Sequence, residues 1–336
     1  MASLRRRLDC PTPVKDLAVV FVNYQTPDDV SASVASIERT AADLVAEIVV
    51  VDNASGDGSA GLLRQRHPRI RVLEQRENRG FAAGVNAGFR ATSAPHVLVL
   101  NPDTEVRPRA LAALRDHLQA NPGVGVVGPI LLERDGAVRL DSYKGLPSIW
   151  SLFCGAFFPL GRVLTGTRFH PELRARRDSD RGGTVPRICG SAMAIRRAAF
   201  DEAGPMDEGY FLYFEEIEWQ RRAADHGWGI EVVPESRVVH AIQGGQVKET
   251  WPLPYVDSAF RYMRGRGLGR GRLARVLLVG FALSRLTLRA AAAIPPLRAK
   301  AVRMDAGYAE LETRVRAIRD AAPEDGYESG VPSRSR

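Results

Sequence analysis

The sequence predicts an α/β fold, with a Rossmann-like, mostly parallel sheet that carries helices on both faces. Short apolar runs rich in Val, Ile and Leu recur along the N-terminal part of the chain, and helical stretches separate them. Strand, helix and strand at this spacing form a parallel sheet covered on both faces. The expected strands are 17–22, 47–51, 70–73 and 96–100, and the expected helices are 28–40, 58–66 and 82–91.

Polar residues at the ends of three expected strands predict a binding crevice at one edge of this sheet. Asn23, Asp52 and Asn101 each come directly after a buried apolar run. In open parallel sheets, ligands bind beyond the carboxyl ends of the strands. Asp52 is suited to hydrogen-bond a nucleobase or a ribose, although the small polar residues that follow it are equally typical of a simple turn.

The pattern changes after residue 123. The run 124–132 is a longer apolar strand, and a turn at Asp135-Gly136 leads into 138–140 as a hairpin. Further strands are expected at 188–196 and 230–233, and a helical segment at 251–293, whereas 141–185 gives no assignable pattern. From residue 321 the chain is polar, so a disordered tail is expected.

The composition is that of a globular protein with a basic surface. Of the 336 residues, 45% are apolar and 26% are charged, which is ordinary for a soluble chain with an ample core. The net charge of +8 fits nucleic acid, a phosphorylated small molecule or an anionic membrane. Nucleic acid is the weakest of these, because the arginines are dispersed and no recognition motif is present. Three cysteines without a CxxC pair, and no apolar run near the N-terminus, predict a cytoplasmic protein.

The acidic run at 211–222 is the strongest candidate for catalysis. It places Glu215, Glu216 and Glu218 beside large apolar and aromatic residues. Carboxylates this close repel one another and resist desolvation, so at least one should have a raised pKa, as a general base near neutral pH requires. The alternative is a solvated helix start, where the helix dipole favours acids.

Two other segments carry groups suited to a phosphorylated ligand and a cation. Residues 77–88 hold glycines four apart, including Gly80, with the amides of Asn78 and Asn86 beside them, and a helix start with small residues suits a phosphate. Asp103 follows the strand 96–100, where a carboxylate suits a hard divalent cation that bridges a diphosphate. Taken alone, the segment around Asp103 is more typical of an ordinary strand-to-helix turn.

Taken together and in order, these segments resemble the family 2 inverting glycosyltransferases of the GT-A fold, and within them the bacterial rhamnosyltransferase-like group. The resemblance covers residues 17–245. The matching stretches are Val20-Phe-Val-Asn-Tyr24, Val51-Asp-Asn-Ala-Ser55, Asn78-Arg-Gly-Phe-Ala-Ala-Gly-Val-Asn86, Asn101-Pro-Asp103, Cys189-Gly-Ser-Ala-Met193, Phe211 through Arg222, and His240.

The resemblance implies a role for each matching position. Asp103 would bind the metal, a divalent cation such as Mg²⁺ or Mn²⁺, and His240 would be a further contact to the metal or to the diphosphate. The acidic motif of the family is usually Glu-Asp, with the Asp as base; here Glu216 takes that place and is one methylene longer, so whether Glu216 or Glu215 is the base stays open. The residues implied in nucleotide-sugar binding are Asn23, Asp52, Asn78, Gly80, Asn86, Asn101 and Asp103. The residues implied on the acceptor side are Gly190, Glu218 and Trp219.

The implied function is inverting transfer of a sugar, with rhamnose as first choice, from a nucleoside-diphosphate donor to a lipid-linked or polysaccharide acceptor. The product would be a bacterial cell-envelope glycan. Two alternatives remain: a hexosyl or N-acetylhexosaminyl transferase of the same fold, and a relative that binds nucleotide sugars without turnover, which the Glu-Glu departure permits.

The C-terminal part predicts a peripheral membrane contact at residues 270–300. The segment 273–294 is apolar but carries Arg275, Arg285 and Arg289 within one helical arc, as in a basic helix on an anionic membrane. A core-packed terminal helix with a solvated arginine edge fits equally well. We therefore expect a protein at the cytoplasmic face of the membrane.

The expected units are an arm (1–16), a GT-A domain (17–245, with a nucleotide-binding half 17–122 and an acceptor and catalytic half 123–245), a helical extension (246–320) and a disordered tail (321–336).

Overall fold

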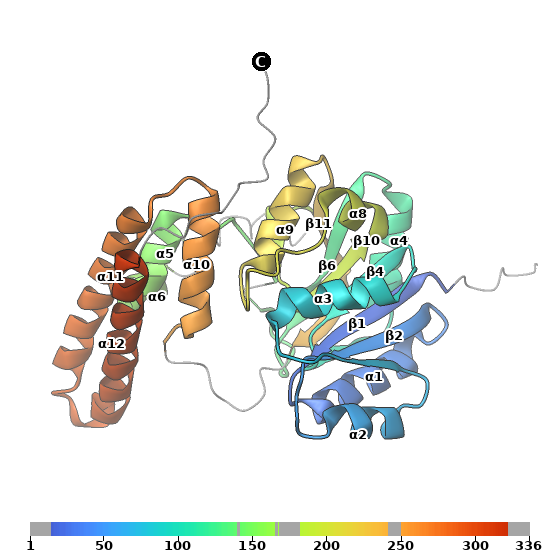
Figure 1. Ribbon diagram of the computed structural model, residues 1–336, viewed down its shortest axis with the longest axis horizontal. Coiled ribbons are helices and arrows are strands. Elements are labelled where there is room, and N and C mark those ends of the chain that lie inside the picture. The colour runs from blue at the N-terminus through green and yellow to red at the C-terminus, as the bar shows by residue number, and fades with distance from the viewer. Residues whose placement is uncertain (1–14, 140–141, 165–166, 168–181, 241–249, 322–336) are drawn as a thin grey trace, which may run out of the picture.

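The computed structural model describes residues 15–139, 142–164, 167, 182–240 and 250–321, arranged as a twisted sheet with helices on both faces and a helical bundle beside it (Figure 1). Most of the N-terminal arm and all but the first residue of the expected disordered tail lie outside these residues.

The N-terminal strands form the parallel part of the sheet, as the sequence predicts. β1 (Leu17–Asn23) lies between β2 (Val45–Asp52) and β4 (His96–Leu100), and β3 (Arg71–Glu74) pairs with the outer side of β2. In this register Asn23 lies beside Asp52, so the polar strand ends meet at one edge.

The C-terminal half adds strands of mixed direction. β10 (Ala192–Arg196) runs antiparallel between β4 and β6 (Val124–Leu132), and β11 (Gly229–His240) runs parallel to β6. β5 (Thr104–Val106) pairs with the end of β11 and brings Thr104 opposite His240. Two short pairings complete the set: β8 (Gly183–Thr184) lies on β11, and β7 (Tyr143–Lys144) pairs with β9 (Arg187–Ile188).

Each face of the sheet has its own apolar core. On one face the strands pack against α1 (Pro27–Ala41), α2 (Ser59–Arg66) and α4 (Ala110–Ala120). On the other face they pack against α3 (Gly80–Ala91), α8 (Arg197–Ala203) and α9 (Glu215–Asp225). The fold class expected from the sequence is therefore confirmed, with the strands at 188–196 divided into β9 and β10 by a turn.

A third core holds the bundle. It is formed by α5 (Ile149–Ala156), α6 (Phe158–Leu164), α10 (Leu253–Gly265), α11 (Arg270–Ala291) and α12 (Arg298–Asp320), with a short turn η1 (Pro295–Leu297) before α12. Phe214 and Ile217 from the acidic run, and Tyr210 directly before it, are buried in the same core. The segment that carries the candidate base is thus held by the bundle as well as by the sheet.

The glycines of α3 serve helix packing rather than the approach of a ligand. A Cβ on Gly84 would come within 2.7 Å of the Val22 side chain, and one on Gly88 within 2.2 Å of the Val20 side chain. The expected groove of glycines is therefore filled by β1. Gly80 is different: its φ is +86° and a Cβ there would lie 2.1 Å from the carbonyl oxygen of Phe211.

Candidate active site

The ends of β1 and β2 form a closed hydrogen-bond network. The Asn23 amide donates to Oδ1 of Asp52 at 2.7 Å, and the Ser55 hydroxyl donates to the same oxygen at 2.6 Å. The backbone N–H of Ser55 donates to Oδ2 of Asp52. Both Asp52 oxygens are therefore held in place, as a rigid acceptor at the edge of the crevice requires.

The loop before α3 connects this edge to the acidic run. The Asn53 amide donates to Oδ1 of Asn78 at 2.9 Å and to the Gly80 carbonyl at 3.0 Å. The backbone N–H of Phe81 donates to the Phe211 carbonyl at 2.9 Å. Only glycine fits at position 80, because a side chain there would collide with the backbone of Phe211.

Asn86 is engaged with the protein itself. Its amide donates to the Met206 carbonyl at 2.9 Å and to Glu208, and its Oδ1 accepts from the Met206 backbone N–H. The side chain is almost fully buried. Asn86 thus links α3 to the segment before the acidic run, and the geometry fits a positioning role better than direct contact with a nucleotide.

The structure brings Asp103 and His240 together from two parts of the chain that are far apart in the sequence. Oδ1 of Asp103 lies 3.2 Å from Nε2 of His240, because β5 pairs with the end of β11. Asp103 also lines a cavity of about 560 Å³ together with Asp29, Arg39 and Arg134. Burial raises the pKa of Asp29, and the nearby charge of Asp103 adds to the rise.

The Asp103–His240 pair fits a divalent cation that takes most of its ligands from substrate. Nδ1 of His240 is buried and has no hydrogen-bond partner among the described residues, so the ring is not committed to a purely structural contact. Within the same residues, no group of three or more His, Cys, Asp or Glu side chains could hold a metal ion. Two protein donors are sufficient where diphosphate oxygens and waters complete the shell.

Glu215 and Glu216 begin α9 after a strained turn. Tyr213 and Phe214 both have φ of +70°, a left-handed conformation that is costly for aromatic residues and that clusters at functional sites. Oε2 of each glutamate is buried without a hydrogen-bond partner in the described part of the chain.

Burial sets the protonation of this pair. Burial and the neighbouring charge of Glu216 raise the pKa of Glu215 well above its ordinary value. Burial also raises the pKa of Glu216, and the positive charges of Arg187 and Lys144 oppose that rise. The two carboxylates therefore differ in environment, with Glu216 the one that faces cations.

The turn before β10 joins the two candidate centres. The backbone N–H of Asn101 donates to the Ser191 carbonyl at 2.9 Å, which fixes the start of the Asn-Pro-Asp segment. A Cβ on Gly190 would lie 3.0 Å from Cγ of Glu216, so Gly190 and Glu216 are in direct contact. Asp103 and Glu216 are thus held on either side of one tight turn.

Arg187 and Lys144 are site residues that the sequence does not reveal. They face each other in the β7–β9 pair, and Nε of Arg187 donates to the Gly145 carbonyl at 3.0 Å. The side chain of Gln220 in α9 binds the backbone of Ile188 twice. Its Oε1 accepts from the Ile188 N–H at 2.7 Å, and its Nε2 donates to the Ile188 carbonyl at 2.9 Å. Both cations belong to short strands at the edges of a region without periodicity, so no pattern points to them.

Two residues expected on the acceptor side have other partners. Trp219 is fully buried between the sheet and α8, and its Nε1 donates to the Gly204 carbonyl at 2.8 Å. Contact between Trp219 and an acceptor is therefore wrong as a prediction. Glu218 forms a two-pronged ion pair with Arg222 at 2.9 and 3.0 Å, and Arg222 in turn bonds the carbonyls of Ala203 and Pro205. Glu218 fits a positioning role through this arginine.

Comparison with known proteins agrees with the fold. The pattern of glycosyl transferase family 2 matches residues 18–204. The chain is 30% identical over 235 residues to the N-acetylglucosaminyl-diphospho-decaprenol L-rhamnosyltransferase of Mycobacterium tuberculosis, a match that covers 67% of this chain and 75% of the relative. It is 29% identical over 245 residues to the low-salt glycan biosynthesis hexosyltransferase Agl10 of Haloferax volcanii, covering 71% of this chain and 70% of that protein.

Two solved glycosyltransferase structures share the architecture. The mannosyltransferase PcManGT from Pyrobaculum calidifontis, solved with GDP-Man and Mn²⁺, superposes with a TM-score of 0.56 at 18% identity, over 90% of this chain and 84% of that one. GalNAc-T7, solved with UDP, GalNAc and Mn²⁺, also gives 0.56, at 16% identity over 75% of this chain. The match spans about half, 48%, of the length of GalNAc-T7. At these identities the likeness concerns the fold.

Proposed function

The chain belongs to glycosyl transferase family 2, and from this premise we propose that it transfers rhamnose from a nucleoside diphosphate to a lipid-linked or polysaccharide acceptor. The product would be a cell-envelope glycan. The observation that supports a working catalytic centre best is the convergence around Gly190. There the Asn-Pro-Asp segment, which leads to the Asp103–His240 pair, and the partly buried Glu216 meet at one turn.

In this proposal the donor lies along the polar strand ends, with Asp52 facing the base and Asn23 beside the nucleotide. Asn78, Gly80 and Asn101 shape the remainder of the nucleotide-sugar site. Asp103 and His240 would hold Mg²⁺ or Mn²⁺, which when bound would stabilise the negative charge that develops on the leaving diphosphate.

Glu216 would accept the proton of the attacking acceptor hydroxyl. A carboxylate with a raised pKa, placed among apolar groups, is a competent base near neutral pH. Attack from the face opposite the leaving diphosphate inverts the anomeric carbon. Glu215, more deeply buried and with its pKa raised further, would be protonated beside Glu216 and would leave that residue to take the proton.

Rhamnose is preferred over other sugars because the mycobacterial relative is named an L-rhamnosyltransferase. A hexose is the second candidate, since the Haloferax relative is named a hexosyltransferase and matches almost as well. The acceptor type rests on the diphospho-decaprenol named for the first relative.

One experiment separates these candidates. The purified full chain is incubated with a panel of nucleoside-diphosphate sugars, rhamnose, hexoses and N-acetylhexosamines, with Mg²⁺, with Mn²⁺ or with a chelator, and release of nucleoside diphosphate is measured. Metal-dependent release from the rhamnose donor alone supports the proposal. Release from a hexose donor alone moves the assignment to the second candidate, and no release from any donor contradicts both.

We also propose a peripheral position at the cytoplasmic face of the membrane. Among the described residues, no helix is both long and apolar enough to span a bilayer. An exposed strip of apolar side chains runs along α11 and the turn after it. It comprises Val279, Leu283, Leu286, Ile294 and Leu297. Exposed arginines flank it, among them Arg275, Arg289 and Arg298. The sequence predicts Arg285 on this arginine edge as well, but that placement is wrong, because Arg285 pairs with Asp305 and Glu312 of α12.

The division into units also remains our proposal. The GT-A domain would span 17–245, in the two halves 17–122 and 123–245, and the bundle formed mainly by 246–320 would present the acceptor.

A further inference from the structure

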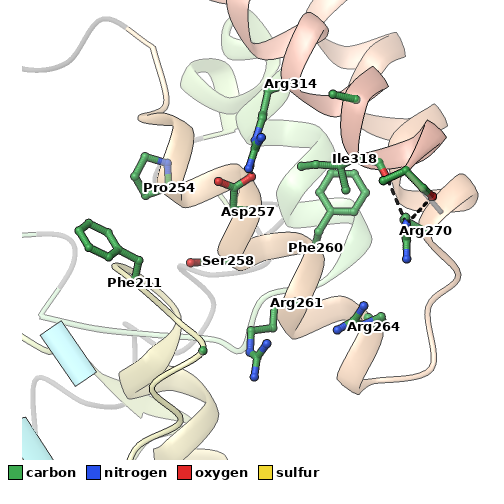
Figure 2. Close-up of a pocket in the computed structure, with 13 residues that line it drawn as sticks. Phe211, Pro254, Asp257, Ser258, Phe260, Arg261, Arg264, Arg270, Arg314 and Ile318 are labelled. Carbon is green, nitrogen blue, oxygen red and sulfur yellow. Dashed lines mark hydrogen bonds and ion pairs between the residues drawn. The ribbon is translucent and has the colours of Figure 1, made fainter. Parts of the chain in front are cut away.

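A basic cavity separate from the Asp103 site lies between the bundle and the acidic run. Its volume is about 540 Å³, and Gly209 and Phe211 form one wall while α10, the start of α11 and the end of α12 form the others (Figure 2). Four arginines line it, Arg261, Arg264, Arg270 and Arg314, against one carboxylate, Asp257. The cavity therefore carries an excess of positive charge.

Contacts with the protein hold Arg261, Arg270 and Arg314 in place. Arg261 pairs with Asp207 at 2.8 Å and lies over the Tyr210 ring, with its Cζ 5.2 Å from the ring centroid. Arg314 pairs with Asp257 at 2.7 Å. Arg270 donates to the carbonyls of Ile318 and Ala321 at the end of α12, as Figure 2 shows. Guanidinium groups oriented in this way are ready to receive an anion without further ordering.

The cavity is built onto the same segment that carries Glu216. The Ser258 hydroxyl of α10 donates to the Leu212 carbonyl at 2.9 Å, and the Phe214 ring packs 4.9 Å from Tyr255 and 5.5 Å from Tyr262. Gly209 and Phe211 line the cavity, and Glu216 follows five positions after Phe211. The cavity and Glu216 therefore share one continuous segment of chain, which α10 holds in place.

We propose that this cavity binds the diphosphate of a lipid-linked acceptor. The inference rests on the proposed function, and it adds where the acceptor is recognised. The bridging diphosphate is the group of such an acceptor that carries charge, and arginine forks match phosphate oxygens in pairs. Phe211, half exposed at the rim, offers an apolar surface to the adjoining prenyl chain or sugar.

The test measures binding of inorganic pyrophosphate and of an isoprenyl diphosphate by calorimetry, with a chelator present so that the metal site does not contribute. The proteins are the wild type, Arg264→Gln, Asp257→Asn and Arg90→Gln, the last an exposed arginine on α3 away from the cavity. Arg264→Gln should weaken binding about tenfold, the effect of losing a charge-assisted hydrogen bond. Asp257→Asn should strengthen it severalfold, because a carboxylate is removed and Arg314 is released.

The opposite signs of the two cavity variants distinguish a ligand site from a structural role, which would weaken binding in both. Arg90→Gln should equal the wild type. Equal affinity in all four proteins would overturn the proposal, as would a loss in Arg90→Gln matching that in Arg264→Gln. Vesicles of phosphatidylglycerol without isoprenyl diphosphate distinguish the source: if they alone show the opposing shifts, the cavity binds lipid headgroups and the acceptor assignment is overturned.

The failure of this proposal is separable from that of the proposed function. If the wild type hydrolyses a nucleotide sugar but the four proteins bind diphosphate alike, the cavity assignment fails and the glycosyl transfer stands. If the opposing shifts appear without hydrolysis of any donor, the reverse holds.

Discussion

Glu216 combines the features of a base at a single residue. It contacts Gly190, lies within the influence of Arg187 and Lys144, and has a buried oxygen without a partner among the described residues. Glu216→Gln retains the shape and removes the proton acceptor. We expect turnover to fall by about 10²–10⁴-fold, the usual contribution of a general base, with little change in nucleotide affinity.

Glu215→Gln is the matched control for this change. It should reduce turnover far less, because Glu215 is more deeply buried and its pKa is raised well above the ordinary value by burial and by the charge of Glu216, which makes it a poorer partner for the acceptor hydroxyl. Steady-state rates and nucleotide binding measured on both variants give the answer. If turnover is lost in Glu215→Gln and normal in Glu216→Gln, the base is Glu215. If turnover is normal in both variants, neither glutamate acts as the base.

The same burial predicts a pH dependence of stability. The folded-state pKa of Glu215 is raised well above its unfolded value by burial and by Glu216. The folded state therefore holds this proton more tightly than the unfolded state, and the free energy of unfolding falls as pH rises above the ordinary glutamate pKa of about 4.3. In Glu215→Gln this fall in the free energy of unfolding with rising pH is absent.

Glu215→Gln should therefore raise the melting temperature by a few degrees at pH 8, with the gain shrinking toward zero near pH 4. Thermal unfolding of both proteins across this range measures it. The conservative Glu218→Gln, which alters a partly exposed ion pair with Arg222, should show no comparable pH-dependent gain. A constant difference between Glu215→Gln and wild type at every pH would contradict the explanation.

Asp103 and His240 lead to a prediction about metal binding. Asp103→Asn keeps the size of the side chain and removes its charge, so Mn²⁺ should no longer strengthen binding of a nucleoside diphosphate. We expect that metal-dependent gain, on the order of tenfold or more, to be lost while binding without metal is kept. His240→Gln should reduce the gain partially. An undiminished gain from Mn²⁺ in Asp103→Asn would place the cation elsewhere.

At the scale of elements, the turn 189–191 sets the position of α9 against β4. Gly190→Ala would place a Cβ 3.0 Å from Cγ of Glu216, so the glutamate must shift by a few tenths of an ångström. Turnover is sensitive to such displacements, and we expect kcat to fall on the order of tenfold while the fold is retained.

Gly61→Ala on α2 is the control for that variant, since a Cβ there meets nothing within 4 Å. It should leave kcat unchanged and stabilise the helix slightly. Circular dichroism and steady-state kinetics on both proteins provide the measurement. A kcat equal to that of the wild type in Gly190→Ala would show that turnover does not depend on a displacement of Glu216 by a few tenths of an ångström.

The elements that the sequence reveals are those whose burial produces a clear period. β1, β2, β3 and β4 appear within two residues of the expected bounds, because each is a short apolar run between polar turns. The pairing of Asp103 with His240 was expected only from the family resemblance, since 136 residues separate them and the β5–β11 contact leaves no local pattern.

The sequence fails where an element depends on tertiary contacts. α5 and α6 lie in a stretch with scattered glycine and proline, and they become helical against α11, where a Cβ on Gly280 would lie 2.7 Å from the Ala156 side chain. The acceptor-side role of Trp219 came from the family resemblance. Its burial depends on tertiary contacts with Phe200 and the Gly204 carbonyl, which leave no local pattern in the sequence.

At the scale of the whole molecule, the bundle packs against the segment that carries Glu215 and Glu216, and it exposes the apolar strip of α11. Phe214 is buried in the core shared by α10, α11 and α12. Removing the bundle would therefore expose that core and displace Glu215 and Glu216, which follow Phe214 directly. Deletion is therefore a poor test of membrane contact. Substitutions confined to the exposed strip leave the core intact.

The apolar strip of α11 is the part of the bundle that we expect to contact a membrane. Val279, Leu283 and Leu286 are 54%, 37% and 66% exposed, on one side of α11. Such a surface, flanked by arginines, binds anionic bilayers by apolar burial together with charge attraction. Replacing all three by Ser should lower partitioning onto phosphatidylglycerol vesicles by about tenfold or more, since each buried CH₂ contributes roughly 0.8 kcal/mol.

The control is Val138→Ser, which changes an exposed apolar residue of the sheet domain and should float like the wild type. Flotation of the full chain measures this, and equal recovery of the triple variant and the wild type with the vesicles would exclude the α11 strip as the contact. Equal binding of the wild type to neutral phosphatidylcholine vesicles would exclude the flanking arginines as its source of selectivity.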